Sequence, residues 1–354
     1  MNALRHNVCT ADLVVRTRAE LRTRRCAVRL LVTALLLIAG TATASADFAH
    51  FVHSLWPQAH TRGVSRATFD AAFQGVTPDP DVIERTHKQA EFLKPIGDYL
   101  ATAVSEKRIG NGRLKAREWK EILEKVERIY GVDPYVVLGV WGMETNFGGY
   151  VGDKYVIRAL ATLAYARYRG DYFKKELLSA LQVLQAGHVQ VKDMQGSWAG
   201  AMGQTQFMPS SFNHYAVDFD GDGHKDIWTN IPDALASTAN YLKKHGWIAG
   251  ETWGYEVLLP AGLEASGGAS HYRPFAHWAA QGVSRVDGEA MPREGEAAVI
   301  TPAGARGPAF LVTRNFKVIK TYNNSTSYAL GVALLGDRIA GWPALKASWP
   351  TAAR

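Results

Sequence analysis

Apolar residues recur at three- and four-residue spacing from Val64 to Tyr130, as at Ile122, Val126 and Ile129. An α-helix turns once every 3.6 residues, so this spacing gathers the apolar side chains on one helical face and leaves the polar residues on the other. A helix-rich region is therefore expected in the N-terminal part of the chain.

A second pattern begins at Asp133-Pro134, which has the form of a helix start, with Asp as the N-cap and Pro in the first turn. The run that follows, YVVLGVWGMETNFGG, is apolar nearly all round. A helix without a polar face belongs in a core. We expect this helix to stop at Gly148-Gly149.

The remaining pattern predicts further helices and one region that is not helical. The helices are expected at about 156–168, 172–188, 232–245 and 328–340, with one more turn from Pro209 that ends a loop rich in Gly and amides. Residues 252–320 lose the helical period and contain β-favouring runs such as YEVLL and AFLVTRNFKVI. The expected fold is mainly α (α+β), with a small β-rich insertion.

The first 46 residues differ from the rest, with an Arg-rich stretch up to Arg29, the apolar run LLVTALLLI and small residues that end at Ala46. About 20 apolar residues are needed to span a bilayer, and this run is roughly half as long. We expect a secretory signal peptide, cleaved after Ala46, rather than a membrane anchor. Since no Cys follows the apolar run, a lipid-anchored form is not expected, and the location is predicted to be periplasmic or secreted.

Removal of this leader changes the charge and the cysteine content. Residues 1–46 carry seven Arg and two acidic residues, so the formal net charge falls from +7 to +2. The basic balance of the whole chain is then no sign of nucleic-acid binding. Both cysteines, Cys9 and Cys26, lie in the leader. The mature chain is therefore expected to have no disulfide and no thiol chemistry.

Glu144 lies in the last turn of the apolar helix, beside Trp141, Met143 and Phe147. Desolvation and the partial negative charge of a helix C-terminus should both raise the pKa of this carboxyl. A carboxyl that stays protonated near neutral pH can donate a proton to the leaving oxygen of a glycosidic bond. The alternatives are a Glu that faces solvent at a fraying helix end, or one that pairs with Arg158.

Standard glycosidases use two carboxylates, and Asp153 is the nearest second candidate. It lies in the turn VGDKY, where Asp is common for conformational reasons alone. A mechanism with one carboxylate, in which the substrate supplies the nucleophile, is therefore the better interpretation.

Four segments, in order along the chain, resemble the membrane-bound lytic murein transglycosylase B family in its soluble form. They are GVWGMETNFGGYVG (139–152), GSWAGAMGQTQFMPSSFNHYAVDFDGDGHKDIW (196–228), DALASTANYLKKHGW (233–247) and TYNNSTSYALGVALL (321–335). The resemblance implies a lysozyme-like core that cleaves the β-1,4 bond between N-acetylmuramic acid and N-acetylglucosamine in peptidoglycan. It also implies that the muramoyl C6 hydroxyl closes on the anomeric carbon, which gives a 1,6-anhydro end without water.

The same resemblance implies the domain organisation and the site residues. The expected domains are a signal peptide (1–46), an N-terminal α-domain (47–130), a catalytic core (131–250 plus 320–354) and a small β-domain (251–319). The catalytic Glu corresponds to Glu144, which acts first as acid and then as base. The implied substrate-binding residues are Ser197, Gln206, Tyr241, Asn323, Tyr328 and Tyr99. Rings and amides suit a sugar groove, although an ordinary core position is the alternative for each Tyr.

The segment DFDGDGH, from Asp218, has carboxylates at loop positions 1, 3 and 5, Gly at 6 and a backbone carbonyl at 7, as in the first half of an EF-hand. Thr229 replaces the Glu of position 12, and the resemblance favours Asp233 as the closing ligand. Oxygen ligands without a His or Cys cluster favour calcium. We expect a structural calcium ion and no catalytic cofactor; the alternative is a solvated turn. The expected metal ligands are Asp218, Asp220, Asp222, His224 and Asp233.

Two other functions are compatible with these residues. A hydrolytic muramidase would add water instead of closing the ring, and a peptidoglycan-binding scaffold would keep the fold without the activity. The chemistry of the product ends distinguishes a muramidase from a transglycosylase. The variant Glu144→Gln distinguishes a scaffold from an enzyme, since the function of a scaffold would not change. The expected partners are peptidoglycan glycan strands, with no nucleic acid and no membrane span after signal cleavage.

Overall fold

The computed structural model of the chain describes residues 46–88, 94–263 and 271–350. The predicted leader, with Cys9 and Cys26, lies outside the described residues except for Ala46. The chain divides into two compact units, Met1–Pro57 and Gln58–Arg354. Residues 46–57 of the first unit are helical. All elements discussed below belong to the second unit.

Five helices occupy the region that has the helical spacing of apolar residues, which confirms that prediction. They are α2 (Arg66–Phe73), α3 (Pro80–Lys88), α4 (Ile96–Ala103), α5 (Glu106–Glu118) and α6 (Lys120–Tyr130). In α6 the buried side chains are Leu123 and Val126, three residues apart. Ile129 is 47% exposed, so the apolar stripe leaves the core in the last turn of this helix.

The helix predicted from Asp133-Pro134 is α7 (Pro134–Thr145), and its start is as expected. The Asp133 carboxylate accepts a hydrogen bond from the Tyr135 N–H at 2.7 Å. The end differs from the prediction, because Asn146 and Phe147 already have left-handed backbone angles, φ 52° and 61°. The helix therefore stops before Gly148-Gly149.

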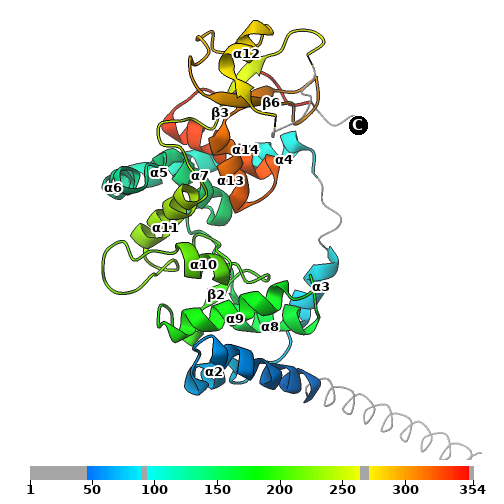
Figure 1. Ribbon diagram of the computed structural model, residues 1–354, viewed down its shortest axis with the longest axis vertical. Helices are drawn as coiled ribbons and strands as arrows, with labels where there is room; N and C mark the ends of the chain where they lie inside the picture. Colours follow the sequence, from blue (N-terminus) through cyan, green and yellow to red (C-terminus); the bar gives the residue numbers. More distant parts are fainter. Residues whose placement is uncertain (1–45, 89–93, 264–270, 351–354) are drawn as a thin grey trace, which may run out of the picture. The chain divides into compact units, whose positions relative to one another are not determined.

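Helix α7 packs against α14 (Thr326–Ala340) (Figure 1). A Cβ built on Gly139 would lie 2.4 Å from the Val332 carbonyl oxygen, and one built on Gly336 would lie 2.7 Å from the Tyr135 carbonyl oxygen. These pairings run in opposite directions along the two helices, so the helices are antiparallel. Because only glycine permits such close backbone contact, these positions fix which residues of α14 face Glu144.

The next helices frame the predicted loop. They are α8 (Val156–Tyr165), α9 (Tyr172–Gln185), α10 (Pro209–Tyr215) and α11 (Ile231–Lys244), with a 3-10 turn, η2, at Val191–Asp193. Helix α9 packs against both α8 and α10, and α11 packs against α6 and α7. Two short strands, β1 (Lys154–Tyr155) and β2 (Gln195–Gly196), pair antiparallel. The loop from Gly196 to Phe212 therefore starts from β2 and ends in α10.

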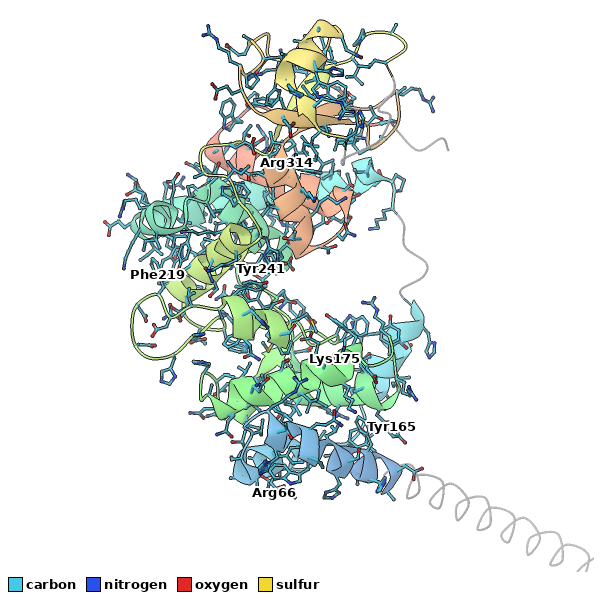
Figure 2. All side chains as sticks on the ribbon, viewed as in Figure 1. Arg66, Tyr165, Lys175, Phe219, Tyr241 and Arg314 are labelled. Atoms are coloured by element: carbon cyan, nitrogen blue, oxygen red, sulfur yellow. The ribbon has the colours of Figure 1, made fainter. Side chains whose placement is uncertain are left out.

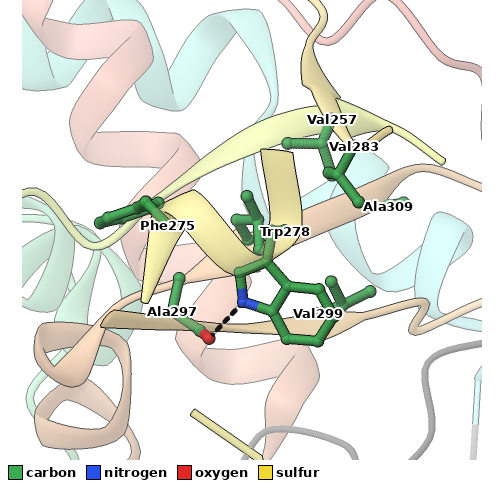
Figure 3. Close-up of a cluster of buried hydrophobic side chains, with 8 residues drawn as sticks. Val257, Phe275, Trp278, Val283, Ala297, Val299 and Ala309 are labelled. Atoms are coloured by element: carbon green, nitrogen blue, oxygen red, sulfur yellow. Dashed lines mark hydrogen bonds between the residues drawn. The ribbon is translucent and has the colours of Figure 1, made fainter. Parts of the chain in front are cut away.

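The predicted β-rich insertion is a five-stranded antiparallel sheet with the strand order β4-β6-β7-β3-β5. Its strands are β3 (Gly254–Leu258), β4 (Arg273–Pro274), β5 (Ser284–Arg285), β6 (Glu296–Ile300) and β7 (Ala309–Val312). Helix α12 (Phe275–Ala280) lies over this sheet, and its Trp278 indole N–H donates to the Ala297 carbonyl at 2.8 Å (Figure 3). A mainly helical chain with a small antiparallel sheet in the insertion is the mainly α (α+β) fold class expected from the sequence.

The run AFLVTRNFKVI was expected to favour β structure throughout, and this is wrong for its second half. The strand ends at Val312, and α13 (Arg314–Tyr322) follows. The Thr313 hydroxyl caps the new helix by accepting the Asn315 N–H at 3.2 Å. Phe316 and Ile319 are both buried at the helical spacing of three, so capping and packing prevail over β propensity.

Within the described ranges, no helix is both long enough and apolar enough to cross a bilayer.

Candidate active site

Glu144 lies in the last turn of α7, partly buried, and contacts the first turn of α14. The hydroxyl of Tyr328 donates a hydrogen bond to Glu144 Oε1 at 2.5 Å. The antiparallel packing of α7 on α14 explains this contact, since it brings the start of α14 against the end of α7. Tyr328 itself is buried.

Burial raises the pKa of Glu144 to about 7, although the hydrogen bond from Tyr328 favours the charged form and lowers it. Desolvation therefore outweighs the hydrogen bond, and the predicted rise is confirmed. Arg158 is engaged elsewhere, because its guanidinium donates to the carbonyls of Thr77 and Pro78 at 2.8 and 3.0 Å. Asp153 is an exposed residue in the turn before β1. With a pKa near neutrality, the Glu144 carboxyl can both donate and accept a proton at neutral pH.

Three phenols come close enough to Glu144 to respond to its charge. Burial, and after it the negative charge of Glu144, raises the pKa of Tyr99, Tyr322 and Tyr328. Tyr99 comes from α4 and Tyr322 from the end of α13. The phenols therefore stay neutral at physiological pH, and of the three it is Tyr328 whose hydroxyl donates to the carboxyl.

Tyr322 was missed by sequence reasoning, although it directly precedes Asn323 in TYNNSTSY. Its hydroxyl donates to the Thr205 carbonyl at 2.7 Å, which ties the end of α13 to the Gly-rich loop. The adjacent Asn323 is exposed at the C-terminal end of α13. The signal in the sequence that could have identified Tyr322 was its position next to Asn323, within a segment that resembles the family.

Tyr241 lies on α11 (Figure 2) and is buried. Its hydroxyl donates to the Thr321 carbonyl at 2.7 Å, and its ring centroid lies 4.8 Å from that of Tyr322. It stacks on His245 with 3.9 Å between ring centroids. Tyr241 thus packs against Tyr322, whereas Tyr322 and Tyr328 lie nearer to the Glu144 carboxyl.

Ser197 and Gln206 lie in the Gly-rich loop and hold its shape. The Ser197 hydroxyl accepts the Ala201 N–H at 3.0 Å. The Gln206 side-chain amide donates to the carbonyls of Val151 and Gly203 at 3.0 and 2.9 Å. The contact with Val151 connects this loop to the segment that follows α7.

Backbone strain is concentrated around this site. Within the described residues, five non-glycine residues have positive φ. Three of them lie near this site: Asn146 and Phe147, two and three residues after Glu144, and Gln206 in the loop. Left-handed angles cost free energy for such residues and persist where tertiary contacts impose them, which happens most often at functional sites. The strain adds a second observation that points to this region.

The acidic loop, residues 218–229, gathers three of the predicted metal ligands. One carboxylate oxygen from each of Asp218, Asp220 and Asp222 lies within 4.8 Å of the others. The Asp218 carboxylate also accepts the N–H groups of Gly221 and Gly223, at 2.7 and 2.8 Å. Phe219 marks this loop in Figure 2. Clustered carboxylates are the ligands that a hard cation such as calcium prefers.

Asp233 is fully buried at the start of α11 and joins the two ends of the acidic loop. Its carboxylate accepts the N–H groups of Phe219 and Asp226, at 2.7 and 2.8 Å. Burial raises its pKa, and the charges of Asp220 and Asp218 contribute. His224 is exposed, and its backbone N–H donates to the Asp222 carboxylate at 2.7 Å. Both oxygens of Asp233 accept backbone N–H groups, whereas those of Asp218, Asp220 and Asp222 lie close together, and these three hard donors fit calcium.

Comparison with known proteins identifies relatives of this chain. The model of the family described as "Transglycosylase SLT domain" matches residues 47–337. The chain is 34% identical over 248 residues to membrane-bound lytic murein transglycosylase B of Escherichia coli K12. That match covers 68% of this chain and 66% of the relative, so the chain spans slightly less than two thirds of that protein.

Two solved structures are also similar. SltB3 of Pseudomonas aeruginosa, crystallised in complex with NAG-anhNAM-pentapeptide, is 47% identical with a TM-score of 0.83, over 86% of this chain and 82% of its own. The Escherichia coli lytic transglycosylase Slt35, crystallised in complex with calcium, is 30% identical with a TM-score of 0.70, over 83% of this chain and 92% of its own.

Proposed function

We propose, since this chain belongs to the transglycosylase SLT domain family, that it is a lytic transglycosylase that cleaves the glycan strands of peptidoglycan. The observation that carries this proposal is the partly buried carboxyl of Glu144, which has a pKa of about 7 and a hydrogen bond from Tyr328, whose pKa the Glu144 charge raises in turn. Such a group can serve as an acid and then as a base within one reaction.

In the first step, protonated Glu144 donates its proton to the oxygen that links N-acetylmuramic acid to N-acetylglucosamine. The bond between the muramoyl C1 and this oxygen breaks, and the leaving sugar departs with a hydroxyl group. The Tyr328 hydrogen bond stabilises the carboxylate that is left behind.

In the second step, the Glu144 carboxylate accepts the proton of the muramoyl C6 hydroxyl as its oxygen bonds to C1. The product end is a 1,6-anhydro sugar, no water is consumed, and Glu144 is protonated again. One carboxyl therefore suffices, in contrast to the pair that standard glycosidases use. Asp153, the nearest second candidate, is exposed in its turn, which agrees with this scheme.

The anhydro product is supported by the relative SltB3, which was crystallised with NAG-anhNAM-pentapeptide. Mass spectrometry of the fragments that the purified protein releases from sacculi tests the proposal. Anhydro-muramoyl ends are expected. Reducing ends would identify a hydrolytic muramidase instead, and no release at all would indicate a peptidoglycan-binding scaffold.

The substrate would lie in a groove that would run past Glu144 and be lined by the loop of Ser197 and Gln206 and by Tyr99, Asn323 and Tyr328. Rings supply stacking faces for sugars, and amides and hydroxyls supply directional hydrogen bonds. The catalytic core would comprise residues 131–250 and 320–354, with the N-terminal α-domain at 47–130 and the sheet of residues 251–319 as an insertion. The leader pattern of residues 1–46 supports secretion to the periplasm.

The acidic loop would hold a structural calcium ion through Asp218, Asp220, Asp222, Asp233 and the His224 carbonyl. Calcium supplies charge compensation there and takes no part in the chemistry. The calcium complex of the relative Slt35 supports this assignment. Since an ion that binds only the folded state stabilises it, calcium should raise the melting temperature and a chelator should lower it. An identical melt with and without calcium would mean that the loop is a solvated turn.

A further inference from the structure

The carboxamide of Gln204 is buried between helix α7 and the end of the acidic loop. Its Oε1 accepts the indole N–H of Trp141 at 2.7 Å, and its Nε2 donates to the Trp228 carbonyl at 3.2 Å. The backbone N–H of Gln204 donates to the Ile227 carbonyl at 2.8 Å. Gln204 is 7% exposed and Trp141 3% exposed, so water does not compete for these hydrogen bonds.

The α7 residues near Gln204 lie on both sides of Glu144 in the sequence. Trp141 precedes Glu144 by three residues, which is one helical turn. On the other side, the Thr145 hydroxyl lies 3.3 Å from the Trp141 carbonyl oxygen and 3.4 Å from the Gln204 carbonyl oxygen, and it accepts the Gly148 N–H at 3.0 Å. The Gln204 side chain therefore holds the turn of α7 that carries Glu144 through Trp141, and the Gln204 backbone carbonyl lies beside Thr145 at the other end of that turn.

The next residue, Thr205, holds the opposite side of the site. Its carbonyl accepts the hydroxyl of Tyr322, whose pKa is raised by burial and then by the charge of Glu144. Gln204 and Thr205 thus fix both the helix that carries the acid and one of the phenols near it. Both residues are buried.

On its far side, Gln204 is joined to the acidic loop. The Trp228 N–H donates to Asp226 Oδ1 at 2.8 Å, and the Asp226 N–H donates to the buried carboxylate of Asp233 at 2.8 Å. An unbroken series of hydrogen bonds therefore runs from Asp233 through Gln204 to Trp141. Spatial connection alone does not demonstrate coupling, so the effect of Gln204 has to be measured.

We propose that Gln204 is a positioning residue, which sets the place of Glu144 by holding Trp141 against the end of the acidic loop. This inference rests on the proposed function of Glu144, but Gln204 itself takes no part in proton transfer. A side chain that only fills space at this position would leave Trp141 without a hydrogen bond and would loosen the last turn of α7.

The test compares Gln204→Met, which keeps the volume but removes the hydrogen bonds, with Asn315→Leu. Asn315 is also a buried amide, and it holds the backbone of Ile248 and Glu251 outside the site. We expect Gln204→Met to lower kcat about 10-fold or more with KM within about twofold, as expected of a small misplacement of the acid. The titration midpoint of the Glu144 carboxyl, followed by ¹³C NMR, should also fall, because a looser turn admits water.

Asn315→Leu should lower the melting temperature but leave kcat per folded molecule and the Glu144 midpoint unchanged. If Gln204→Met likewise changes only the melting temperature, Gln204 is structural and the proposal is overturned. The carboxyl titration does not depend on which reaction occurs, so a wild-type protein that released no anhydro product would defeat the proposed function without deciding the role of Gln204.

Two further variants keep the test decisive. Trp141→Phe removes the same hydrogen bond from the other side, so it should reproduce the loss, and the double variant should be no worse than the more damaging single one. Additive losses would overturn the proposal.

The variant Gln204→Glu should restore the hydrogen bonds at low pH. Once protonated, its carboxyl can accept from Trp141 and donate to Trp228, so its rate relative to wild type should recover at about pH 5 and fall at about pH 8. A ratio that is equally low at both pH values would contradict the proposal.

Discussion

The antiparallel pair of α7 and α14 holds two carboxyl groups whose pKa is raised to about 7. One is Glu144, at the C-terminal end of α7, and the other is Asp337, near the C-terminal end of α14. Burial is the largest cause of the rise in both cases. Desolvation alone therefore does not tell a catalytic acid from a structural carboxyl.

The surroundings of the two groups differ. Asp337 accepts the indole N–H of Trp253 at 3.0 Å, and Trp253 is buried at the start of the β-rich insertion. The charge of Asp133, the N-cap of α7, raises the pKa of Asp337 further. Glu144 instead lies among phenols, beside a strained turn and a loop rich in Gly and amides. The difference teaches that neighbouring donors, together with backbone strain, distinguish the proposed acid from the group that joins the insertion to the core.

Substitution of each carboxyl by its amide should give the largest difference. Glu144→Gln should lower the rate of glycan cleavage about 1000-fold, within the usual range for a general acid, because the amide has no proton to donate. Asp337→Asn keeps an acceptor for Trp253 and should retain activity within about threefold. The measurement is release of soluble fragments from sacculi per folded molecule. Comparable losses in both variants would remove the distinction between the two regions.

The pH dependence of stability should show what the two groups share. Each folded pKa is about 7, against ordinary values of 4.5 for Glu and 3.8 for Asp. A raised carboxyl stabilises the folded state fully below its unfolded pKa, and this contribution is lost as the pH rises through about 7. The free energy of unfolding should therefore fall by roughly 3–4 kcal/mol per group between pH 4 and pH 8.

Urea denaturation at several pH values measures this loss. Asp337→Asn and Glu144→Gln should each make the curve of stability against pH flatter than in the wild type, because an amide does not ionise. Curves that run parallel to the wild type would mean that the substituted carboxyl has an ordinary pKa in the folded protein.

The smallest effect is expected from removing the hydrogen-bond donor of each carboxyl. Tyr328→Phe should reduce the rate about 10-fold, the usual cost of a lost charge-assisted hydrogen bond, and should raise the pKa of Glu144. The alkaline limb of the pH–rate profile should then move to higher pH. Trp253→Phe is the matched control, since it should raise the pKa of Asp337 and leave this profile unmoved. A shift in the control, or none with Tyr328→Phe, would contradict the assignment.

Local signals in the sequence were sufficient for much of this architecture. The Asp133-Pro134 start of α7, the helices before it, the β-rich insertion and the apolar spacing of α14 depend on residues close together in the chain, so a pattern could predict them. The raised pKa of Glu144 followed from an apolar helix for the same reason.

Other features depend on contacts between distant residues. Trp141 and Gln204 are 63 positions apart, and only the fold brings them together. The early end of α7 has a similar cause, because the Phe147 ring is buried near Gly112 and Gly142 and holds its own backbone at positive φ. No spacing rule contains this information, so the end of α7 was misplaced, and Tyr322 and Gln204 were missed.

Direct titration of the Glu144 carboxyl in the intact protein tests the central claim most closely. With ¹³C-labelled glutamate, and with Glu144→Gln to assign the signal, we predict a midpoint near pH 7 that coincides with the alkaline limb of the pH–rate profile. A midpoint near the ordinary Glu value of 4.5 would contradict the account, because the carboxyl would then hold almost no proton to donate at neutral pH.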